Sequence, residues 1–167
     1  PVTLMGHSMG GGVACAVAAR RPDLVGHLAL LASLGPTPHF PQWLYQGAAR
    51  VIRRQTPRRL LMPLIRVAFS ALGFPARLPE REIVRSMLDS AATDFAEHRH
   101  NLAHLRCPTL VAWSRDDRLI PPPIFEHLER LAPAGPRLRF EGGGHNIQKT
   151  RAVEIAAALM GWLARRA

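Results

Sequence analysis

The stretch Pro1-Val-Thr-Leu-Met5, followed at once by Gly6-His7-Ser8-Met9-Gly10, decides the fold. Its first five residues form a short apolar run that is typical of a buried strand, and the run ends at Gly6. Small residues then predominate until Pro22, which predicts the end of a helix, and residues 25–33 form a second apolar run of strand length. A strand, a helix of small residues and another strand in this order indicate a βαβ unit in a parallel sheet.

The alternation of predicted strands and helices is interrupted between residues 35 and 105. Prolines at positions 36, 38, 41, 57, 63, 75 and 79 divide this stretch into short helical pieces. Apolar residues at positions 84, 88, 91, 95, 102 and 105 predict that its last piece is one amphipathic helix. We therefore interpret residues 35–105 as a helical insertion between two parts of one core, residues 1–34 and 106–167.

Strands and helices alternate again after the insertion. The pattern predicts a strand over residues 109–113 and a helix from Pro122 or Pro123 to about Leu131. Residues 137–140 alternate as a strand, and Thr150 is in a position to cap a last helix over residues 152–165. The fold class predicted is α/β, a parallel sheet with flanking helices.

Composition excludes several classes of protein. With 167 residues, 47% of them hydrophobic and 20% charged, the chain suits one folded domain and is not disordered. Its apolar runs are shorter than the roughly 18 residues that a membrane-spanning helix needs. Cys15 and Cys107 lack the spacing of a disulfide scaffold or a zinc site, and without a secretory signal we expect a cytoplasmic protein.

The net charge of +10 comes from arginine, because Lys149 is the only lysine. These arginines are spread along the chain and match no nucleic-acid-binding motif, so we expect no nucleic-acid partner. A basic run interleaved with apolar residues resembles a helix that meets anionic lipid, but we favour a solvated surface over membrane contact. The run consists of Arg50, Arg53, Arg54, Arg58, Arg59 and Arg66.

Gly6-His7-Ser8-Met9-Gly10 matches the pattern G-x-S-x-G between a strand and a helix. A nucleophilic serine on such a sharp turn is strained, and we expect side chains at Gly6 or Gly10 to collide with it. The N–H of Met9 would then be placed to donate to an oxyanion. The alternative is an ordinary glycine-rich turn whose serine caps the helix.

Two further segments supply partners for such a serine. His145 follows Gly142-Gly-Gly144 directly after the last predicted strand, where it can act as a base. Asp116 and Asp117 follow the strand that ends near Trp113, and a carboxylate there can orient the imidazole. Because the carboxyl ends of parallel strands share one crevice, the order Ser, Asp, His predicts one site.

From the serine motif to its C-terminus, the chain resembles the α/β-hydrolase fold family. The resemblance implies that Ser8 is the nucleophile, that Asp117 rather than Asp116 is the acid, and that His145 is the base. Ser114 stands where the family commonly has glycine, and residues 35–105 correspond to the family's helical cap. Members that attack with aspartate are disfavoured, because this chain has Ser8 at that position.

The function expected from this resemblance is hydrolysis of an ester, thioester or lactone, with a small-molecule acyl substrate and no cofactor. C–C bond hydrolysis or perhydrolysis by the same triad and a non-catalytic binding module remain open, as does the oligomeric state. As substrate-binding residues we expect His7, Phe40, Trp43 and Leu119. No metal is expected, since His98, His100 and His104 lack a carboxylate that would complete a site.

The chain opens on Pro1 rather than on methionine, with a strand already under way. The family's sheet begins before the nucleophile strand. We therefore expect a longer parent chain, and we expect these 167 residues alone to aggregate and to be nearly inactive.

Overall fold

The computed structural model describes residues 1–165, apart from the side chains of Thr56 and Pro57. It has two compact units. The core unit comprises Pro1–Thr37 and Phe95–Ala167, and the helical unit comprises Pro38–Asp94. The insertion expected over residues 35–105 is thus shorter in the structure.

The core unit contains a sheet of four parallel strands, which confirms the predicted fold class. They are β1 (Val2–His7), β2 (Val25–Leu31), β3 (Thr109–Ser114) and β4 (Arg137–Phe140), and they lie side by side in chain order. Since all four run in the same direction, their carboxyl ends lie at one edge of the sheet. The turns that follow β1, β3 and β4 therefore meet there.

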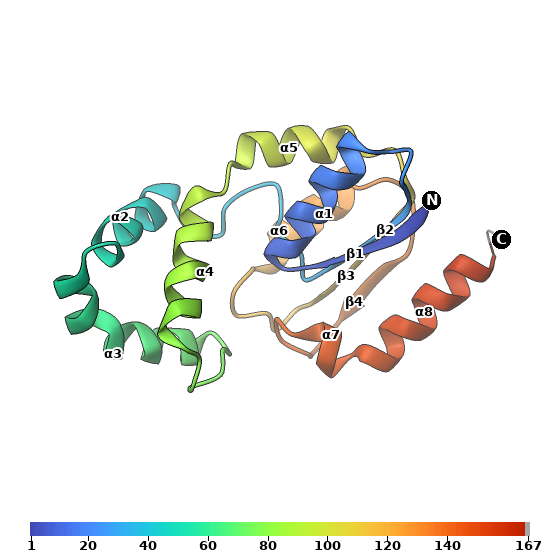
Figure 1. Cartoon of the computed structure of the whole chain (residues 1–167). Coiled ribbons are helices and arrows are strands. Elements are labelled where there is room, and N and C mark those ends of the chain that lie inside the picture. Colours follow the sequence, from blue (N-terminus) through green and yellow to red (C-terminus); the bar gives the residue numbers. More distant parts are fainter. Residues whose placement is uncertain (166–167) are drawn as a thin grey trace. The chain divides into compact units, whose positions relative to one another are not determined.

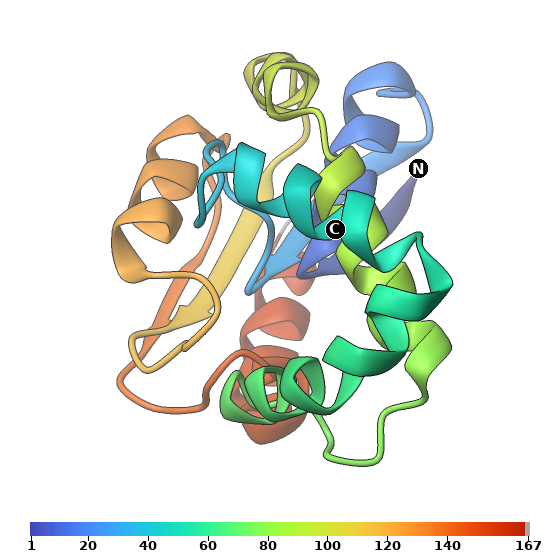
Figure 2. The same cartoon turned by 90° about the vertical axis from the view of Figure 1, so that its left-hand side faces the viewer.

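Helices cover both faces of this sheet, as Figures 1 and 2 show. One face carries α1 (Met9–Arg20), α5 (Phe95–Ala103) and α6 (Pro122–Leu131). After the short α7 (Ile147–Thr150), α8 (Ala152–Ala164) lies along the opposite face. The core between these layers is apolar, and its largest side chains include Leu28, Leu30, Leu110, Trp113, Phe125, Leu128 and Trp162.

β1 forms one edge of the described sheet. The strand is present as predicted, and Val2 and Met5 are exposed, because in this sheet β1 has a neighbouring strand on only one side. The central strands β2 and β3 have a neighbour on each side, and β3 is buried throughout. The difference in burial follows from the number of neighbouring strands.

The helical unit consists of α2 (Gln42–Ile52), α3 (Gln55–Ala71) and α4 (Glu80–Ala92). It has its own small apolar core, formed by Ile52, Met62 and Ile83. Two arginines of the basic run act within this unit. Arg58 pairs with Glu80 at 3.0 Å, and Arg66 donates to the carbonyl of Leu78.

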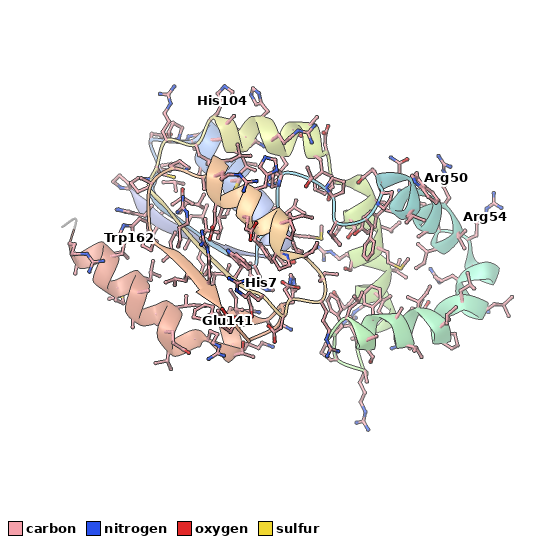
Figure 3. The ribbon with its side chains drawn as sticks, turned by 180° about the vertical axis from the view of Figure 1, so that it is seen from behind. His7, Arg50, Arg54, His104, Glu141 and Trp162 are labelled. Atoms are coloured by element: carbon pink, nitrogen blue, oxygen red, sulfur yellow. The ribbon has the colours of Figure 1, made fainter. Side chains whose placement is uncertain are left out.

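The other arginines of the run are exposed, and Arg50 and Arg54 can be seen projecting from their helix and turn in Figure 3. Among the described residues, no helix has both the length and the apolar character that crossing a membrane requires.

The prediction of a single amphipathic helix that ends near residue 105 is wrong. The helical conformation is interrupted at Thr93, whose backbone is extended (ψ 119°), and the segment forms two helices, α4 and α5. The Thr93 hydroxyl donates to the carbonyl of Asp89 at 3.0 Å, and Gln42 donates to the carbonyl of Thr93 at 3.2 Å. Helix α5 belongs to the core unit, where Glu97 pairs with Arg20 of α1.

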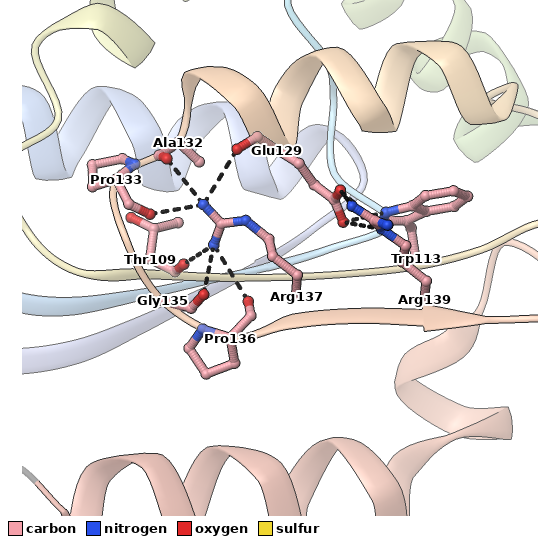
Figure 4. A network of polar contacts seen from close by, with 9 residues as sticks. All are labelled: Thr109, Trp113, Glu129, Ala132, Pro133, Gly135, Pro136, Arg137 and Arg139. Carbon is pink, nitrogen blue, oxygen red and sulfur yellow. Dashed lines mark hydrogen bonds and ion pairs between the residues drawn. The ribbon is translucent and has the colours of Figure 1, made fainter.

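The turn between α6 and β4 is held by Arg137, as Figure 4 shows. Its guanidinium lies half-buried and donates to backbone carbonyls at 2.6–3.3 Å. These carbonyls belong to Thr109, Glu129, Ala132, Pro133, Gly135 and Pro136.

Beside Arg137, the buried carboxylate of Glu129 accepts from the indole N–H of Trp113 at 2.8 Å and pairs with Arg139 at 2.5 Å. Buried charged groups of this kind stabilise a fold only when they are fully hydrogen-bonded.

Candidate active site

Ser8 stands between the end of β1 and Met9, the first residue of α1. Its backbone has φ 53° and ψ −126°, a conformation that L-residues rarely adopt. Three backbone hydrogen bonds hold it. Ser8 N–H donates to Leu31, and the Ser8 carbonyl accepts from Gly11 and Leu34, all at 3.0–3.1 Å. A strained residue that its surroundings hold in this way is characteristic of functional sites.

The glycines around Ser8 have different roles. A Cβ added to Gly6 would lie 2.5 Å from the carbonyl oxygen of Gly10, so the collision expected there is confirmed. A Cβ on Gly10 would meet nothing within 4 Å, so the same expectation for Gly10 is wrong. Instead Gly11 is the tight position, since its Cβ would lie 1.9 Å from Oγ of Ser33. Gly11 stands in a run of three glycines, whose spacing did not reveal which one is in close contact.

A continuous chain of hydrogen bonds joins Ser8, His145 and Asp117. Nε2 of His145 lies 2.8 Å from Oγ of Ser8, and its Nδ1 lies 2.8 Å from Oδ2 of Asp117. A carboxylate only accepts, so Nδ1 carries the proton and Nε2 is left to accept from the serine hydroxyl. The His145 and Asp117 side chains are 8% and 0% exposed, so bulk water competes little for these bonds.

Asp117 is itself fixed by backbone. Its Oδ1 accepts from the N–H groups of Leu119 and Ile120 at 2.8 and 3.0 Å. With one oxygen held by the turn after β3, the other is directed at His145. The carboxylate therefore sets the orientation of the imidazole.

The neighbouring Asp116 has a different partner, the glycine loop before His145. Oδ1 accepts from Gly144 N–H at 2.7 Å and Oδ2 from Gly143 N–H at 3.2 Å. Oδ1 also accepts from the hydroxyl of Ser114 at 2.5 Å. The bond from Ser114, and after it that from Gly144, lowers the pKa of the Asp116 carboxyl below its ordinary value.

Other side chains hold the same loop by its carbonyls. Thr150 donates to Gly143 at 2.7 Å, and Arg151 donates through Nε to Gly142 at 2.7 Å. Thr150 was expected to cap the last helix, but it ends α7, and Arg151 is the residue that precedes α8. Gly143 and Gly144 have φ of 150° and 64°, which explains the glycines of this loop.

The expected substrate-binding residues are in different surroundings. His7 is the last residue of β1, and its Nε2 donates to the carbonyl of His145 at 2.9 Å. Leu119 packs against the apolar core of the core unit. Phe40 and Trp43 belong to the helical unit, where they are 45% and 69% exposed.

Within residues 1–165 no three side chains of His, Cys, Asp or Glu gather as a set of metal ligands. His98 is buried and donates to the carbonyl of Leu34 at 3.2 Å. His100 and His104 lie with their ring centroids 4.1 Å apart.

The model of the alpha/beta hydrolase family matches residues 1–158. The chain is 29% identical to the 2-hydroxy-6-oxononadienedioate/2-hydroxy-6-oxononatrienedioate hydrolase of Cupriavidus pinatubonensis, over 88% of this chain and 56% of the relative. It is 27% identical to the dihydrolipoyllysine-residue acetyltransferase component of the acetoin cleaving system of Cupriavidus necator, over 93% of this chain and 44% of the relative.

Among solved structures, a thermophilic esterase from Thermogutta terrifontis superposes with a TM-score of 0.70 and 23% identity. The match covers 98% of this chain and 65% of the esterase chain. At this identity the likeness concerns the fold.

The chain spans about half the length of the two curated relatives, 44% of one and 56% of the other.

Proposed function

Because the chain belongs to the alpha/beta hydrolase family, we propose that it is a serine hydrolase in which Ser8 attacks a carbonyl carbon. The hydrogen-bond chain from Ser8 through His145 to Asp117 is the observation that carries the proposal. It supplies a hydroxyl, a base within reach of its proton, and a carboxylate that holds the base in the required tautomer.

The proposed reaction has two stages. Nε2 of His145 takes the hydroxyl proton as Oγ of Ser8 bonds to the carbonyl carbon, and the carbonyl oxygen gains the negative charge. The N–H of Met9, at the start of α1, stabilises that oxyanion together with the helix dipole. His145 then gives the proton to the leaving group, which departs and leaves an acyl-enzyme.

A water molecule completes the second stage. His145 removes a proton from the water as its oxygen attacks the acyl carbon, and it returns that proton to Oγ as the acid leaves. His145 moves every proton in this scheme, so the proposed reaction uses no cofactor.

We propose an ester, thioester or lactone of small size as the substrate. Attack by serine oxygen on an acyl carbon is the reaction that the site's groups favour. The relative from Cupriavidus necator is named an acetyltransferase component, which also concerns acyl groups.

C–C bond hydrolysis is the second candidate. It is favoured by the relative from Cupriavidus pinatubonensis, which is named as a hydrolase of 2-hydroxy-6-oxo dienedioates. The two candidates are distinguished by the wild-type ratio of kcat/KM for short p-nitrophenyl esters to that for a 2-hydroxy-6-oxo dienoate. A ratio well above one supports the ester reaction.

A fluorophosphonate probe tests the nucleophile without a known substrate. We expect the wild type to be labelled and Ser8→Ala to be unlabelled. Ser70→Ala, which changes an exposed serine of α3, is the matched control and should be labelled as the wild type is. Labelling that survives Ser8→Ala would refute the assignment of Ser8. Failure to label the folded wild type would favour a non-catalytic binding module.

A further inference from the structure

His7 is the residue just before Ser8, and its side chain contacts the loop that carries His145. Nε2 of His7 lies 2.9 Å from the carbonyl oxygen of His145, and the two ring centroids are 5.0 Å apart. A carbonyl oxygen only accepts, so the proton of His7 must be on Nε2. Figure 3 labels His7 at the end of its strand.

Burial keeps this ring neutral. It lowers the pKa of His7 below the ordinary histidine value, and this effect outweighs the opposite effect of the hydrogen bond to His145. A neutral His7 does not repel the imidazolium that forms on His145 when Ser8 gives up its proton. The contact is therefore compatible with every protonation state of the proposed reaction.

The loop before His145 is held residue by residue by side chains from other segments. Asp116 accepts from Gly143 and Gly144, while Thr150 and Arg151 donate to Gly143 and Gly142. His7 holds His145, the residue that follows Gly144, by its backbone carbonyl. It does so from the same strand end that presents Ser8, so one short segment fixes both partners of the Ser8–His145 bond.

We propose that His7 is a positioning residue, whose hydrogen bond to the backbone of His145 keeps Nε2 of that imidazole directed at Oγ of Ser8. The inference rests on the proposed function. It replaces the expectation that His7 binds substrate, because its Nε2–H is engaged within the protein.

Three substitutions at position 7 separate the hydrogen bond from the shape of the ring. His7→Phe keeps a ring and removes the donor. His7→Gln removes the ring and places an amide N–H near the position of Nε2. His7→Asn is equally polar, but its amide reaches only to about the position of Nδ1. We expect His7→Gln to preserve the reactivity of Ser8, and His7→Phe and His7→Asn to impair it.

The rate constant for labelling of Ser8 by a small fluorophosphonate is the primary measurement, since it needs no natural substrate. Misplacement of a reacting group by about 1 Å can cost up to about 10²-fold. We therefore expect Phe and Asn to slow labelling by about 10- to 100-fold, and Gln to stay within about threefold of the wild type. With a p-nitrophenyl ester the loss should fall on kcat and leave KM nearly unchanged.

The controls separate this proposal from the proposed function. His104→Gln changes an exposed histidine of the loop after α5 and should label at the wild-type rate. If the wild type is not labelled at all, the proposed function fails, and this inference fails with it. Suppose instead that the wild type is labelled. If His7→Phe is then labelled at the wild-type rate, or His7→Gln is labelled as slowly as His7→Phe, only the positioning role of His7 is overturned. A loss confined to KM would restore a substrate-binding role.

Discussion

Nδ1 of His145 lies 2.8 Å from Oδ2 of Asp117, while the adjacent Asp116 accepts from the backbone of the glycine loop instead. Two neighbouring carboxylates after β3 thus have different partners. One orients the imidazole, and the other holds the loop that carries it. Their substitution should therefore have different consequences.

Asp117→Asn should lower kcat by about 10⁴-fold, because an amide in place of the carboxylate favours the wrong tautomer of His145. Asp116→Asn keeps one acceptor oxygen for the loop and should cost about 10-fold or less. The measurement is kcat of both variants on a p-nitrophenyl ester, with thermal unfolding to confirm that each is folded. Equal losses, or a larger loss for Asp116→Asn, would contradict this division of roles.

Substitution by alanine should have different effects on stability at Gly6, Gly10 and Gly11. Gly6→Ala and Gly11→Ala place a Cβ against the Gly10 carbonyl and against Ser33, so each should destabilise the protein by about 1–3 kcal/mol. The Cβ that Gly10→Ala adds would lie in open space, and Gly10 is part of α1. This substitution should therefore stabilise the protein by about 0.5–1 kcal/mol.

Urea unfolding of the three alanine variants provides the measurement. Gly10→Ala is the internal control, since it makes the same chemical change at a position between the other two. A destabilisation of Gly10→Ala as large as that of Gly11→Ala would show that the second glycine of the pattern is required for steric reasons after all.

Local sequence signals predicted much of the core unit. Prolines and alternating apolar residues predicted β4 and α6 with nearly their observed bounds, and parallel strand order predicted one site for Ser8, His145 and one of two adjacent aspartates. These features depend on short-range patterns and on one topological rule, both of which can be recognised in a single sequence. The choice of Asp117 over Asp116 came from the family resemblance.

Features that depend on tertiary contacts were missed. The break at Thr93 has neither proline nor glycine to mark it, and its backbone is held by Gln42, about fifty positions away. The contact of His7 with the His145 carbonyl joins residues that are 138 positions apart. No pattern of neighbouring residues carries such information, so only the folded chain reveals these contacts.

Arg137 should be important for stability although it takes no part in the proposed triad. Arg137→Met would remove the donor from six carbonyls around the turn before β4 and should destabilise the protein by about 2–3 kcal/mol. Arg115→Met is the control, because its partner Glu141 is exposed and such surface pairs contribute about 0–1 kcal/mol. Similar urea midpoints for the two variants would show that the carbonyl cluster does not depend on Arg137.

Acid should destabilise the protein first through its buried histidines. Burial lowers the pKa of His98, with a smaller contribution from the charge of Arg99, and burial also lowers that of His7. A histidine in the unfolded chain titrates at about pH 6.5. Below that pH the unfolded chain binds protons that the folded chain does not, so stability is greatest above about pH 6.5 and falls as the pH drops toward the folded pKa values.

His98→Gln tests this origin, because glutamine keeps a donor for the carbonyl of Leu34 and removes the titration. We expect the urea midpoint of the wild type to fall between pH 7.5 and 5.5, and that of His98→Gln to fall by clearly less. His104→Gln, at an exposed position, should keep the wild-type slope. The Asp116 carboxyl has a lowered pKa, so the stability that it contributes is lost only in more acidic solution and does not overlap this window. If His98→Gln loses stability as steeply as the wild type, burial of His98 is not the source of the acid sensitivity.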